Sequence, residues 1–444
     1  ERLPDTGSVR IHMTHAGRCT VSFVADDLAQ AGFSFYRLVR VDSAPVNSVA
    51  RTSNSIENEF FRLMATRRGL EIRDLKRDRT MELYFEDAGD RGDEYNFDPV
   101  STDAPIVEPV SLSARVTGDS GPRLRIEVSM VFQVPAALSD DRSSRGSATE
   151  PLAIELVGTL HAGLERVDFV AEVENRSRDH RLRAALRTPV VAADAVHDTS
   201  FGVIRRALEA SEPRGTEDIY PTVPQRSFTA VEGTVFSAAL MARGLLEVEV
   251  RRESAGATIL LTLLRCVGWL SRSDLATRRG GAGPELETPG AQEPGAHRFE
   301  FALTTFQGSY LDGDVIARVE AYTTPPRVFR GASAGASGGL ELVRCDNARV
   351  VFSTARPLAR AGAYKVRAYS ASPLPERARF TFGAERSARM VDLAGRAAKS
   401  QRLKRSRDGS ITIEMRPFQI VTFEVRTRRT RRSGKYFSPT AKKD

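Results

Sequence analysis

Apolar and polar residues alternate along most of the chain, and this alternation predicts β-strands. In a strand, every second side chain points to the same face, so each of these segments can bury one face and expose the other. The pattern predicts strands at residues 17–24, 33–41, 123–132, 164–174, 246–251, 316–322, 364–369 and 411–415. Convincing long helices are absent from the pattern. Many short strands separated by Gly, Pro and Asp turns predict an all-β protein built from β-sandwiches.

Three segments interrupt the strand pattern. Residues 138–150 are small and polar, which indicates a surface loop. Residues 271–296 show almost no apolar periodicity, and an irregular segment of this length in a compact domain is usually functional. Residues 331–339 consist of Gly, Ala and Ser, which is typical of a flexible linker between domains.

The length of 444 residues exceeds what one core can organise, so two or three domains are expected. The net charge is +8, but residues 426–444 alone hold eight Lys/Arg against one acid. The remainder of the chain is therefore close to neutral, and the basic character belongs to a tail. We interpret this tail as solvated and disordered; contact with nucleic acid or an anionic surface is the alternative.

The start and the cysteines bear on the cellular location. The chain begins with Glu1, without a methionine or the apolar core of a signal peptide, so we expect a truncated start. No apolar run approaches the roughly 18 residues that span a bilayer. Cys19, Cys266 and Cys345 show no metal spacing and no disulfide framework, which favours a reducing, cytoplasmic location. Cys266 lies in an apolar run and is predicted to be a buried free thiol.

Few residue patterns indicate catalysis. His12 and His15 lie three apart in a predicted strand, which places them on opposite faces, unlike two metal ligands on one helical turn. We predict structural or surface roles for all the histidines, which are His12, His15, His161, His180, His197 and His297. The chain also lacks a Gly-x-Ser-x-Gly elbow, a phosphate-binding glycine loop, and a cysteine with a nearby histidine base.

An acidic cluster surrounds Tyr95 and leaves three interpretations open. Its members are Asp87, Asp90, Asp93, Glu94 and Asp98. The cluster is a solvated or calcium-prone loop, a rim that contacts sugar, or a pair of catalytic carboxylates, which glycoside hydrolysis needs about 5–10 Å apart. Tyr95 itself suits sugar recognition, because its ring can face C–H groups while its hydroxyl bonds a sugar oxygen. Packing at a strand end is the alternative for Tyr95, and the residues alone favour it.

Two motifs resemble a known family. The sequence IENEFFR at 56–62 and GDEYNFDP at 92–99 resemble the opening of the large β-domain that follows the catalytic barrel in glycoside hydrolase family 38 α-mannosidases. Further similar segments follow in the expected order at residues 180–183, 200–206, 224–228, 263–275, 277–284, 288–292 and 416–423. The resemblance covers the chain from about residue 10 to about residue 425.

This resemblance implies a domain order. The chain is expected to contain a small β-domain at 1–50, a galactose-mutarotase-like β-supersandwich at 51–330, the linker at 331–339, a C-terminal β-sandwich at 340–425 and the basic tail at 426–444. In the family, these parts pack beside an α/β barrel and a helical bundle, and the barrel supplies zinc ligands and the aspartate nucleophile of a retaining mechanism. None of those motifs occurs here. The resemblance therefore implies that zinc belongs to the absent N-terminal domain, and that this chain has no catalytic or metal residue.

The resemblance also implies substrate-binding residues. Tyr95, beside Asp93 in the second motif, matches the family tyrosine that reaches the bound mannoside. Asp274, Arg278 and Arg279 lie in a segment that resembles the family loop against the active-site rim. The two arginines would either order that loop or bond sugar hydroxyls through their fixed donors.

Three functions remain open from the sequence. The first is the non-catalytic C-terminal part of an α-mannosidase, which completes the substrate pocket and supports the catalytic barrel. The second is a stand-alone carbohydrate-binding β-sandwich protein, and the third is a structural surface protein with a basic anchoring tail. The first implies an α-mannoside substrate, the barrel and helical bundle as partners, and a homo-oligomer as in many family members. Neither a membrane nor nucleic acid is expected as a partner, and the isolated chain is expected to be inactive.

Overall fold

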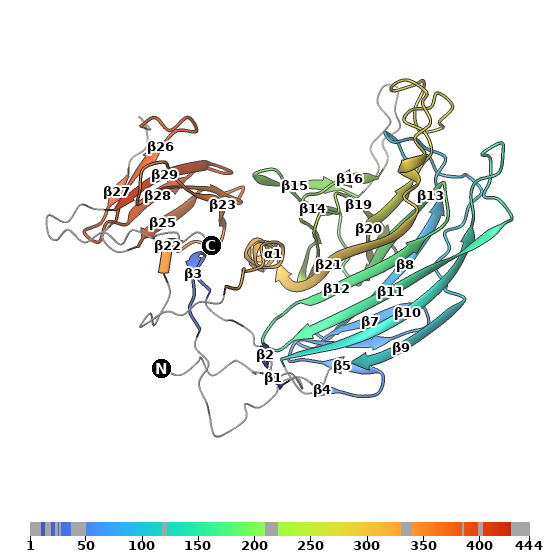
Figure 1. Ribbon diagram of the computed structural model, residues 1–444, viewed down its shortest axis with the longest axis horizontal. Helices are drawn as coiled ribbons and strands as arrows, with labels where there is room; N and C mark the ends of the chain where they lie inside the picture. The colour runs from blue at the N-terminus through green and yellow to red at the C-terminus, as the bar shows by residue number, and fades with distance from the viewer. Residues whose placement is uncertain are drawn as a thin grey trace, which may run out of the picture. The chain divides into compact units, whose positions relative to one another are not determined.

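The computed structural model describes residues 10–13, 19–22, 25, 28–36, 50–117, 122–208, 221–329, 340–383, 386–397 and 403–427. The chain divides into two units (Figure 1). The first comprises residues 1–27 and 38–331, and the second comprises residues 28–37 and 332–444. The predicted linker at 331–339 and the tail from residue 428 lie outside the described residues.

Two nine-stranded antiparallel sheets make up most of the described part of the first unit. One has the order β15-β14-β17-β18-β21-β12-β11-β10-β9, and the other β16-β19-β20-β13-β8-β7-β6-β5-β4. The first sheet contains β9 (Ser111–Thr117), β10 (Arg123–Pro135), β11 (Thr149–His161), β12 (Val167–Asn175), β14 (Asp194–Thr199), β15 (Gly202–Ala207), β17 (Phe228–Val231), β18 (Gly233–Ala242) and β21 (Gly295–Gly308). The second contains β4 (Ala50–Arg51), β5 (Ser55–Glu57), β6 (Phe61–Ala65), β7 (Gly69–Asp74), β8 (Arg79–Gly89), β13 (His180–Thr188), β16 (Thr222–Pro224), β19 (Glu247–Glu253) and β20 (Gly256–Cys266). A separate pair consists of β1 (Arg10–Met13) and β2 (Cys19–Ser22).

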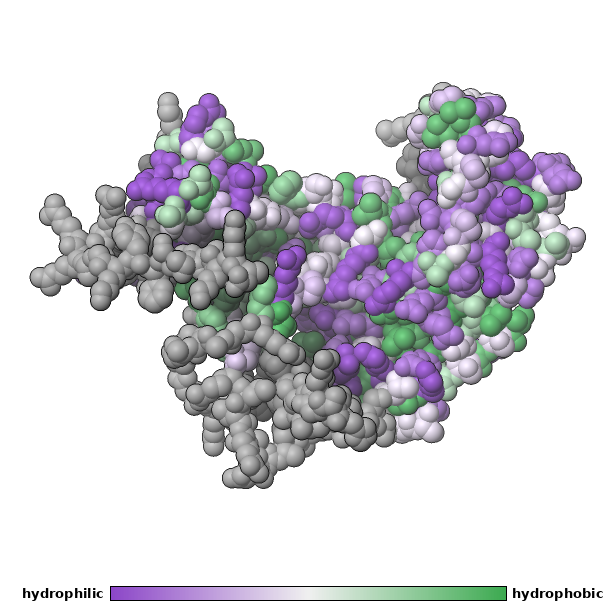
Figure 2. All heavy atoms as spheres, viewed as in Figure 1, coloured by the Kyte–Doolittle hydropathy of each residue, from purple (hydrophilic) through white to green (hydrophobic). Residues whose placement is uncertain are grey.

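One apolar core fills the space between these sheets. Along β10, buried Ile126, Val128 and Met130 alternate with partly exposed Glu127 and Ser129, as the sequence pattern predicts. Each fully buried aliphatic or aromatic side chain stabilises the sandwich by about 1.5–3 kcal/mol. Figure 2 shows hydrophilic side chains over much of the visible outer surface of this unit, with hydrophobic ones scattered among them.

The strand register brings two loops together at one end of the second sheet. His180, the first residue of β13, pairs with Gly89 at the end of β8 and with Cys266 at the end of β20. The chain therefore leaves β8 and β20 at neighbouring positions. The loops that follow them contain all the residues for which a substrate role is predicted.

A helix forms where the alternation predicts a strand. Residues 316–322 belong to helix α1 (Val315–Thr323), so the strand prediction there is wrong. Val315, Ile316, Val319 and Tyr322 are buried, a spacing that suits a helix with one apolar face. Arg243 donates through Nε to the Tyr322 carbonyl at 3.0 Å and satisfies an acceptor at the helix end. No helix in the described part of the chain is long and apolar enough to cross a membrane.

The second unit is a smaller sandwich with its own core. Its described sheets have the orders β27-β28-β25-β22-β3 and β23-β24-β29-β26. The strands are β3 (Ala31–Phe33), β22 (Leu340–Cys345), β23 (Val350–Pro357), β24 (Ala363–Ser370), β25 (Glu376–Phe382), β26 (Arg386–Val391), β27 (Lys404–Arg405), β28 (Ile411–Met415) and β29 (Ile420–Thr427). Val366, Phe380 and Phe423 are fully buried between the sheets.

The all-β fold class is confirmed. One early strand, β3, pairs with β22 in the second unit, and the strand predicted at 33–41 does not continue through residues 34–36. The predicted domain boundaries stay predictions. Cys266 is a buried free thiol, as expected from its apolar surroundings.

Candidate functional site

The loop that follows β8 is shaped by Asp90 and Gly92. One carboxylate oxygen of Asp90, Oδ1, accepts the backbone N–H groups of Gly92 at 2.8 Å and Asp98 at 3.2 Å. A β-carbon at Gly92 would lie 2.0 Å from the Asn96 carbonyl oxygen, so the turn requires glycine. Burial raises the pKa of Asp90, although the charge of Arg265 acts in the opposite direction.

Arg265, near the end of β20, joins its strand to this loop. Its Nε donates to Oδ2 of Asp90 at 2.9 Å, and its Nη2 donates to the carbonyls of Asp93 and Asn96, each at 2.5 Å. The planar guanidinium thus fixes three points of the loop at once. Arg265 lies within residues 263–275, one of the segments that resemble the family, but nothing in the sequence around it indicates this role.

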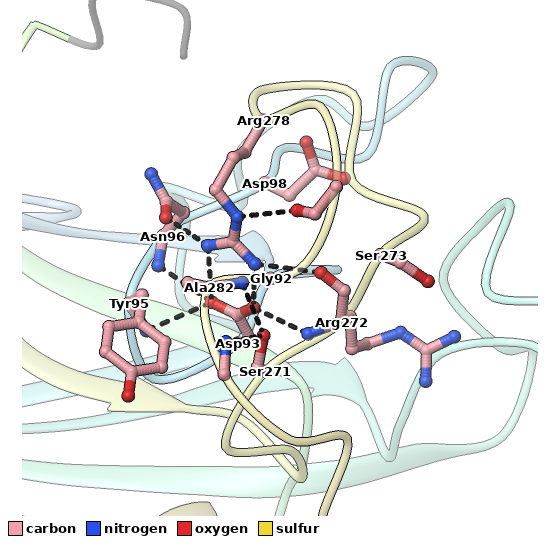
Figure 3. Close-up of polar contacts among 12 residues, drawn as sticks. Gly92, Asp93, Tyr95, Asn96, Asp98, Ser271, Arg272, Ser273, Arg278 and Ala282 are labelled. Atoms are coloured by element: carbon pink, nitrogen blue, oxygen red, sulfur yellow. Dashed lines mark hydrogen bonds and ion pairs between the residues drawn. The ribbon is translucent and has the colours of Figure 1, made fainter. Parts of the chain in front are cut away.

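Asp93 and Arg278 form a buried ion pair at the centre of the site (Figure 3). Nη2 of Arg278 lies 2.5 Å from Oδ2 of Asp93, and the two side chains are 3% and 0% exposed. Asp93 also accepts the backbone N–H groups of Tyr95, Asn96 and Arg272, at 3.0, 2.9 and 2.7 Å. Burial tends to raise the pKa of Asp93, but the hydrogen bonds from Arg278 and these amides outweigh it and hold the pKa below its usual value.

The irregular segment after β20 is locked against the Tyr95 loop. The backbone N–H of Thr277 donates to Oδ1 of Asp98 at 3.0 Å, and the Thr277 hydroxyl donates to the Phe97 carbonyl at 3.0 Å. Buried Ser271 accepts the backbone N–H groups of Ala282 and Gly283, at 2.9 and 3.1 Å. The segment contains one short 3-10 helix, Pro289–Gln292, and otherwise lacks regular structure, as the missing periodicity predicts.

Tyr95 is exposed above this buried base. Tyr95 is 55% exposed, and in Figure 3 its ring points away from the side chain of Arg278. Gly283 lies beside the ring, where an added β-carbon would be 3.4 Å from the Tyr95 hydroxyl oxygen. Asp274 is also exposed, and it forms an ion pair with Arg272. Arg279 is exposed and forms no ion pair or hydrogen bond with the described residues.

The interpretation of the acidic cluster as a solvated loop is wrong for its four aspartates. Asp87, Asp90, Asp93 and Asp98 are each at most 1% exposed, whereas Glu94 is exposed. Burial of carboxylates requires compensating charge or donors. Arginines distant in sequence supply them for Asp87, Asp90 and Asp93, whereas Asp98 lies 3.8 Å from Arg91 of the same loop. The five residues predicted for substrate binding therefore lie on one loop pair, with Asp93 and Arg278 buried and Tyr95, Asp274 and Arg279 exposed.

A second buried ion pair joins Asp87 to His180. Nδ1 of His180 lies 2.5 Å from Oδ2 of Asp87, and Nε2 lies 3.0 Å from Oδ1 of Asn175. The Asn175 amide nitrogen donates to the carbonyls of Gln292 and Glu293, so its oxygen faces His180 as an acceptor. Both ring nitrogens therefore donate, and the imidazole is protonated. Burial tends to lower the pKa of His180, but Asp87 outweighs it and raises the pKa to about 10.

These residues do not form a metal site. Both ring nitrogens of His180 are occupied by hydrogen bonds to Asp87 and Asn175, which leaves neither free for a metal ion. Across the described residues, no three His, Cys, Asp or Glu side chains are grouped so that they would hold a metal ion.

Comparison with known proteins identifies the central part of the chain. Residues 56–271 match the model of the glycosyl hydrolases family 38 C-terminal domain. These residues belong to family 38. The family 38 match includes the Tyr95 loop and ends at Ser271, the residue that holds the second loop.

Individual proteins are similar to this chain over a larger part of its length. A putative mannosylglycerate hydrolase of Halalkalibacterium halodurans is 26% identical over 349 residues, which cover 73% of this chain and 36% of that protein. An α-mannosidase from Enterococcus faecalis V583 has a similar structure, with a TM-score of 0.74 at 20% identity, covering 94% of this chain and 48% of that one. A second Enterococcus faecalis protein of glycosyl hydrolase family 38 gives a TM-score of 0.73 at 19% identity and covers 94% and 50%. The chain thus spans between about a third and a half of these relatives.

Proposed function

We propose that the chain is the non-catalytic β part of a family 38 α-mannosidase, in which it completes the substrate pocket and supports a catalytic domain. Two kinds of observation support this. Residues 56–271 match the family's C-terminal domain, and the relatives named as hydrolases extend well beyond the length of this chain. The intact enzyme would hydrolyse terminal α-mannosidic bonds.

The exposed Tyr95 on a buried, ion-paired base is the observation that carries this proposal. An aromatic ring with a hydroxyl suits a sugar, because the ring covers C–H groups and the hydroxyl bonds a sugar oxygen. Asp93, Arg278 and Arg265 fix the backbone beneath Tyr95, so the loop loses little conformational entropy when a sugar binds.

We assign different roles to the other predicted residues. Asp93 and Arg278 position the Tyr95 loop, because both are buried and their polar atoms are already bonded. Arg279 and Asp274 are exposed on the neighbouring segment and are proposed to contact sugar hydroxyls at the rim. We assign the zinc ion and the nucleophile of a retaining mechanism to the catalytic domain, and no bond-breaking step to this chain.

Kinetics of a joined protein test the proposal. The chain alone, supplied with zinc, is expected to leave p-nitrophenyl α-mannoside uncleaved, whereas the chain joined to its catalytic domain is expected to cleave it. In the joined protein, Tyr95→Ala removes an aromatic contact and a hydrogen bond of about 1 kcal/mol each, which lowers kcat/KM roughly thirtyfold. Phe201→Ala, at another exposed aromatic of the same unit, is the matched control and should leave kcat/KM unchanged.

Two results would contradict the proposal. Zinc-dependent turnover by the chain alone would place catalytic residues within it. Wild-type kinetics for Tyr95→Ala, with an unchanged melting temperature, would remove Tyr95 from the pocket. If the joined protein is inactive but the chain binds α-mannosides through Tyr95, the stand-alone carbohydrate-binding function replaces the proposal.

A further inference from the structure

The only tryptophan of the chain, Trp269, lies beside a fixed polar pair on the loop that follows β20. Arg272 donates through Nε and Nη2 to the two carboxylate oxygens of Asp274, at 2.7 and 2.6 Å. Its Cζ atom lies 5.0 Å from the centre of the Trp269 ring, within the range of a cation–π contact. The carboxylate and the ring together fix the guanidinium plane, and Nη1 of Arg272 forms no hydrogen bond with the described residues.

A third loop contributes a second arginine, Arg142, from the connection between β10 and β11. Its Nη2 donates to the carbonyls of Arg91 and, at 3.5 Å, of Gly92 in the Tyr95 loop. Burial and the charge of Arg272 lower the pKa of Arg142, whereas Asp179 and Asp274 act in the opposite direction. Nε and Nη1 of Arg142 form no hydrogen bond in the described part of the chain, so these donors are available to a ligand.

The loop that carries Arg142 is held in place, although its sequence predicts an ordinary surface loop. The backbone N–H of Ala136 donates to the Ala148 carbonyl at 2.8 Å, and buried Arg145 pairs with Asp87. Arg142 itself has a φ of 58°, in the left-handed region that residues other than glycine rarely adopt. Such conformations persist where the surrounding contacts enforce them, and they are concentrated at ligand-binding sites. The loop therefore presents its arginine at a fixed position.

These polar side chains lie on the other side of the site from Tyr95. In Figure 3, Tyr95 and Arg272 extend in opposite directions from the buried ion pair at the centre. The carbonyl of Trp269 accepts the backbone N–H of Glu94 at 3.0 Å, so both sides are attached to the same loop. We call the following four residues the outer cluster: Arg142, Trp269, Arg272 and Asp274.

The chemistry of the outer cluster suits a neutral pyranose. Asp179 lies 4.0 Å from Arg142, and Asp274 neutralises the other arginine, so the two pairs carry no net charge with which to attract an anion. A pyranose has hydroxyls that accept from guanidinium groups and donate to a carboxylate, and C–H groups that pack on an aromatic ring. The side chain of Asp274 is 51% exposed and Trp269 is partly exposed, so a ligand can reach both.

We propose that the outer cluster is a second sugar subsite, which binds a further sugar of the substrate beyond the mannose held at Tyr95. This role rests on the proposed function, in which Tyr95 contacts the terminal mannose. It narrows the substrate class to α-mannosides that contain at least two sugars. A p-nitrophenyl group in the same position offers no hydroxyl donor to the Asp274 carboxylate and uses the subsite less well.

Tryptophan fluorescence of the full chain tests the subsite directly, because Trp269 is the only tryptophan and its emission reports contacts at this position. The chain is titrated with methyl α-mannoside, with α-1,2-, α-1,3- and α-1,6-mannobiose, and with α-mannotriose. We expect a saturable change in emission with at least one oligosaccharide. Methyl α-mannoside should bind at least about tenfold more weakly, since a single sugar cannot contact Tyr95 and the outer cluster together. Unchanged emission with every oligosaccharide would refute the subsite.

Two variants separate binding at the outer cluster from a purely structural role. Asp274→Asn keeps the size of the side chain but removes the charge that fixes Arg272, so it should weaken oligosaccharide binding at least about tenfold. Arg178→Gln is the matched control and should bind like the wild type, because Arg178 is exposed and its side chain forms no ion pair or hydrogen bond with the described residues.

Kinetics of the joined protein provide a second measurement. The ratio of kcat/KM for the bound mannobiose to kcat/KM for p-nitrophenyl α-mannoside should fall at least about tenfold in Asp274→Asn. A structural effect on the loop would lower both values alike, and an unchanged ratio would therefore refute the subsite. The proposed function is tested separately by Tyr95→Ala, so it can hold when the subsite fails.

Discussion

Replacing Arg278 with methionine tests how the two site loops are held together. The guanidinium donates to both carboxylate oxygens of Asp93, to Oδ1 of Asn96, and to the carbonyls of Arg272 at 2.8 Å and Gly280 at 3.0 Å. Methionine keeps most of the apolar stem and removes every one of these donors.

The expected loss follows from what Asp93 retains. Removing one partner of a buried ion pair typically costs about 3–5 kcal/mol, because the other charge stays buried. Asp93 keeps three backbone N–H donors, from Tyr95, Asn96 and Arg272, so its charge is only partly uncompensated. We therefore expect the lower end, about 3 kcal/mol, confined to the loop pair.

Hydrogen exchange measures this loss locally. The amides of Arg272 and Thr277 donate to Asp93 and Asp98 and report whether the loops remain joined. A loss of about 3 kcal/mol lowers their protection by roughly a hundredfold. Arg279→Met is the matched control, because its exposed side chain makes no contact of this kind in the described structure. Equal protection of these amides in both variants would show that Arg278 does not hold the loops.

Two further predictions concern stability. The pKa of His180 is raised to about 10 in the folded chain, above its ordinary value of 6.5. The protonated His180 therefore stabilises the fold fully below pH 6.5, and this stabilisation is lost as the pH rises through 10. The melting temperature of the first unit should therefore fall between pH 7 and 10, and His180→Gln should remove that slope; a flat wild-type profile would contradict the charge assignment. Gly92→Ala places a methyl group 2.0 Å from the Asn96 carbonyl oxygen, so it should lower the free energy of unfolding measured in urea by about 2 kcal/mol or more. Gly283→Ala, whose nearest atom would be 3.4 Å away, should lower it by less than about 0.5 kcal/mol. Equal losses in the two variants would remove the steric argument.

Local patterns in the sequence were sufficient for the all-β fold. The alternation at residues 123–132 matches β10 because one face of that strand is buried and the other is not. The same reasoning failed at α1, since Val315 and Val319, four residues apart, lie on one face of either a strand or a helix. Burial of Ile316 and Val319 together decides for the helix, because residues three apart lie on opposite faces of a strand, and this burial is a property of the tertiary structure.

The site was only partly predictable. The family motifs located Tyr95, Asp93 and Arg278, but the charges that bury the aspartates come from far along the chain. Arg265 lies 175 residues from its partner Asp90, and Arg278 lies 185 residues from Asp93. Arg91 is the only cation within the acidic cluster itself, so the local sequence is typical of a solvated loop and gave no indication of these distant pairs.

The buried aspartates Asp90 and Asp93 each make two kinds of contact, one within their own turn and one with a distant arginine. Asp90 and Asp93 each accept backbone N–H groups from their own turn, so the shape of the Tyr95 loop is encoded locally. Each also pairs with an arginine of the β20 side, so the position of that loop depends on distant residues. Substitution of either aspartate should therefore disturb both the shape and the position of the Tyr95 loop. Substitution of its arginine partner should leave the turn intact but detach the loop from the β20 side. The orientation of Tyr95 toward a sugar would then depend on Arg265 and Arg278, although neither is exposed beside its ring.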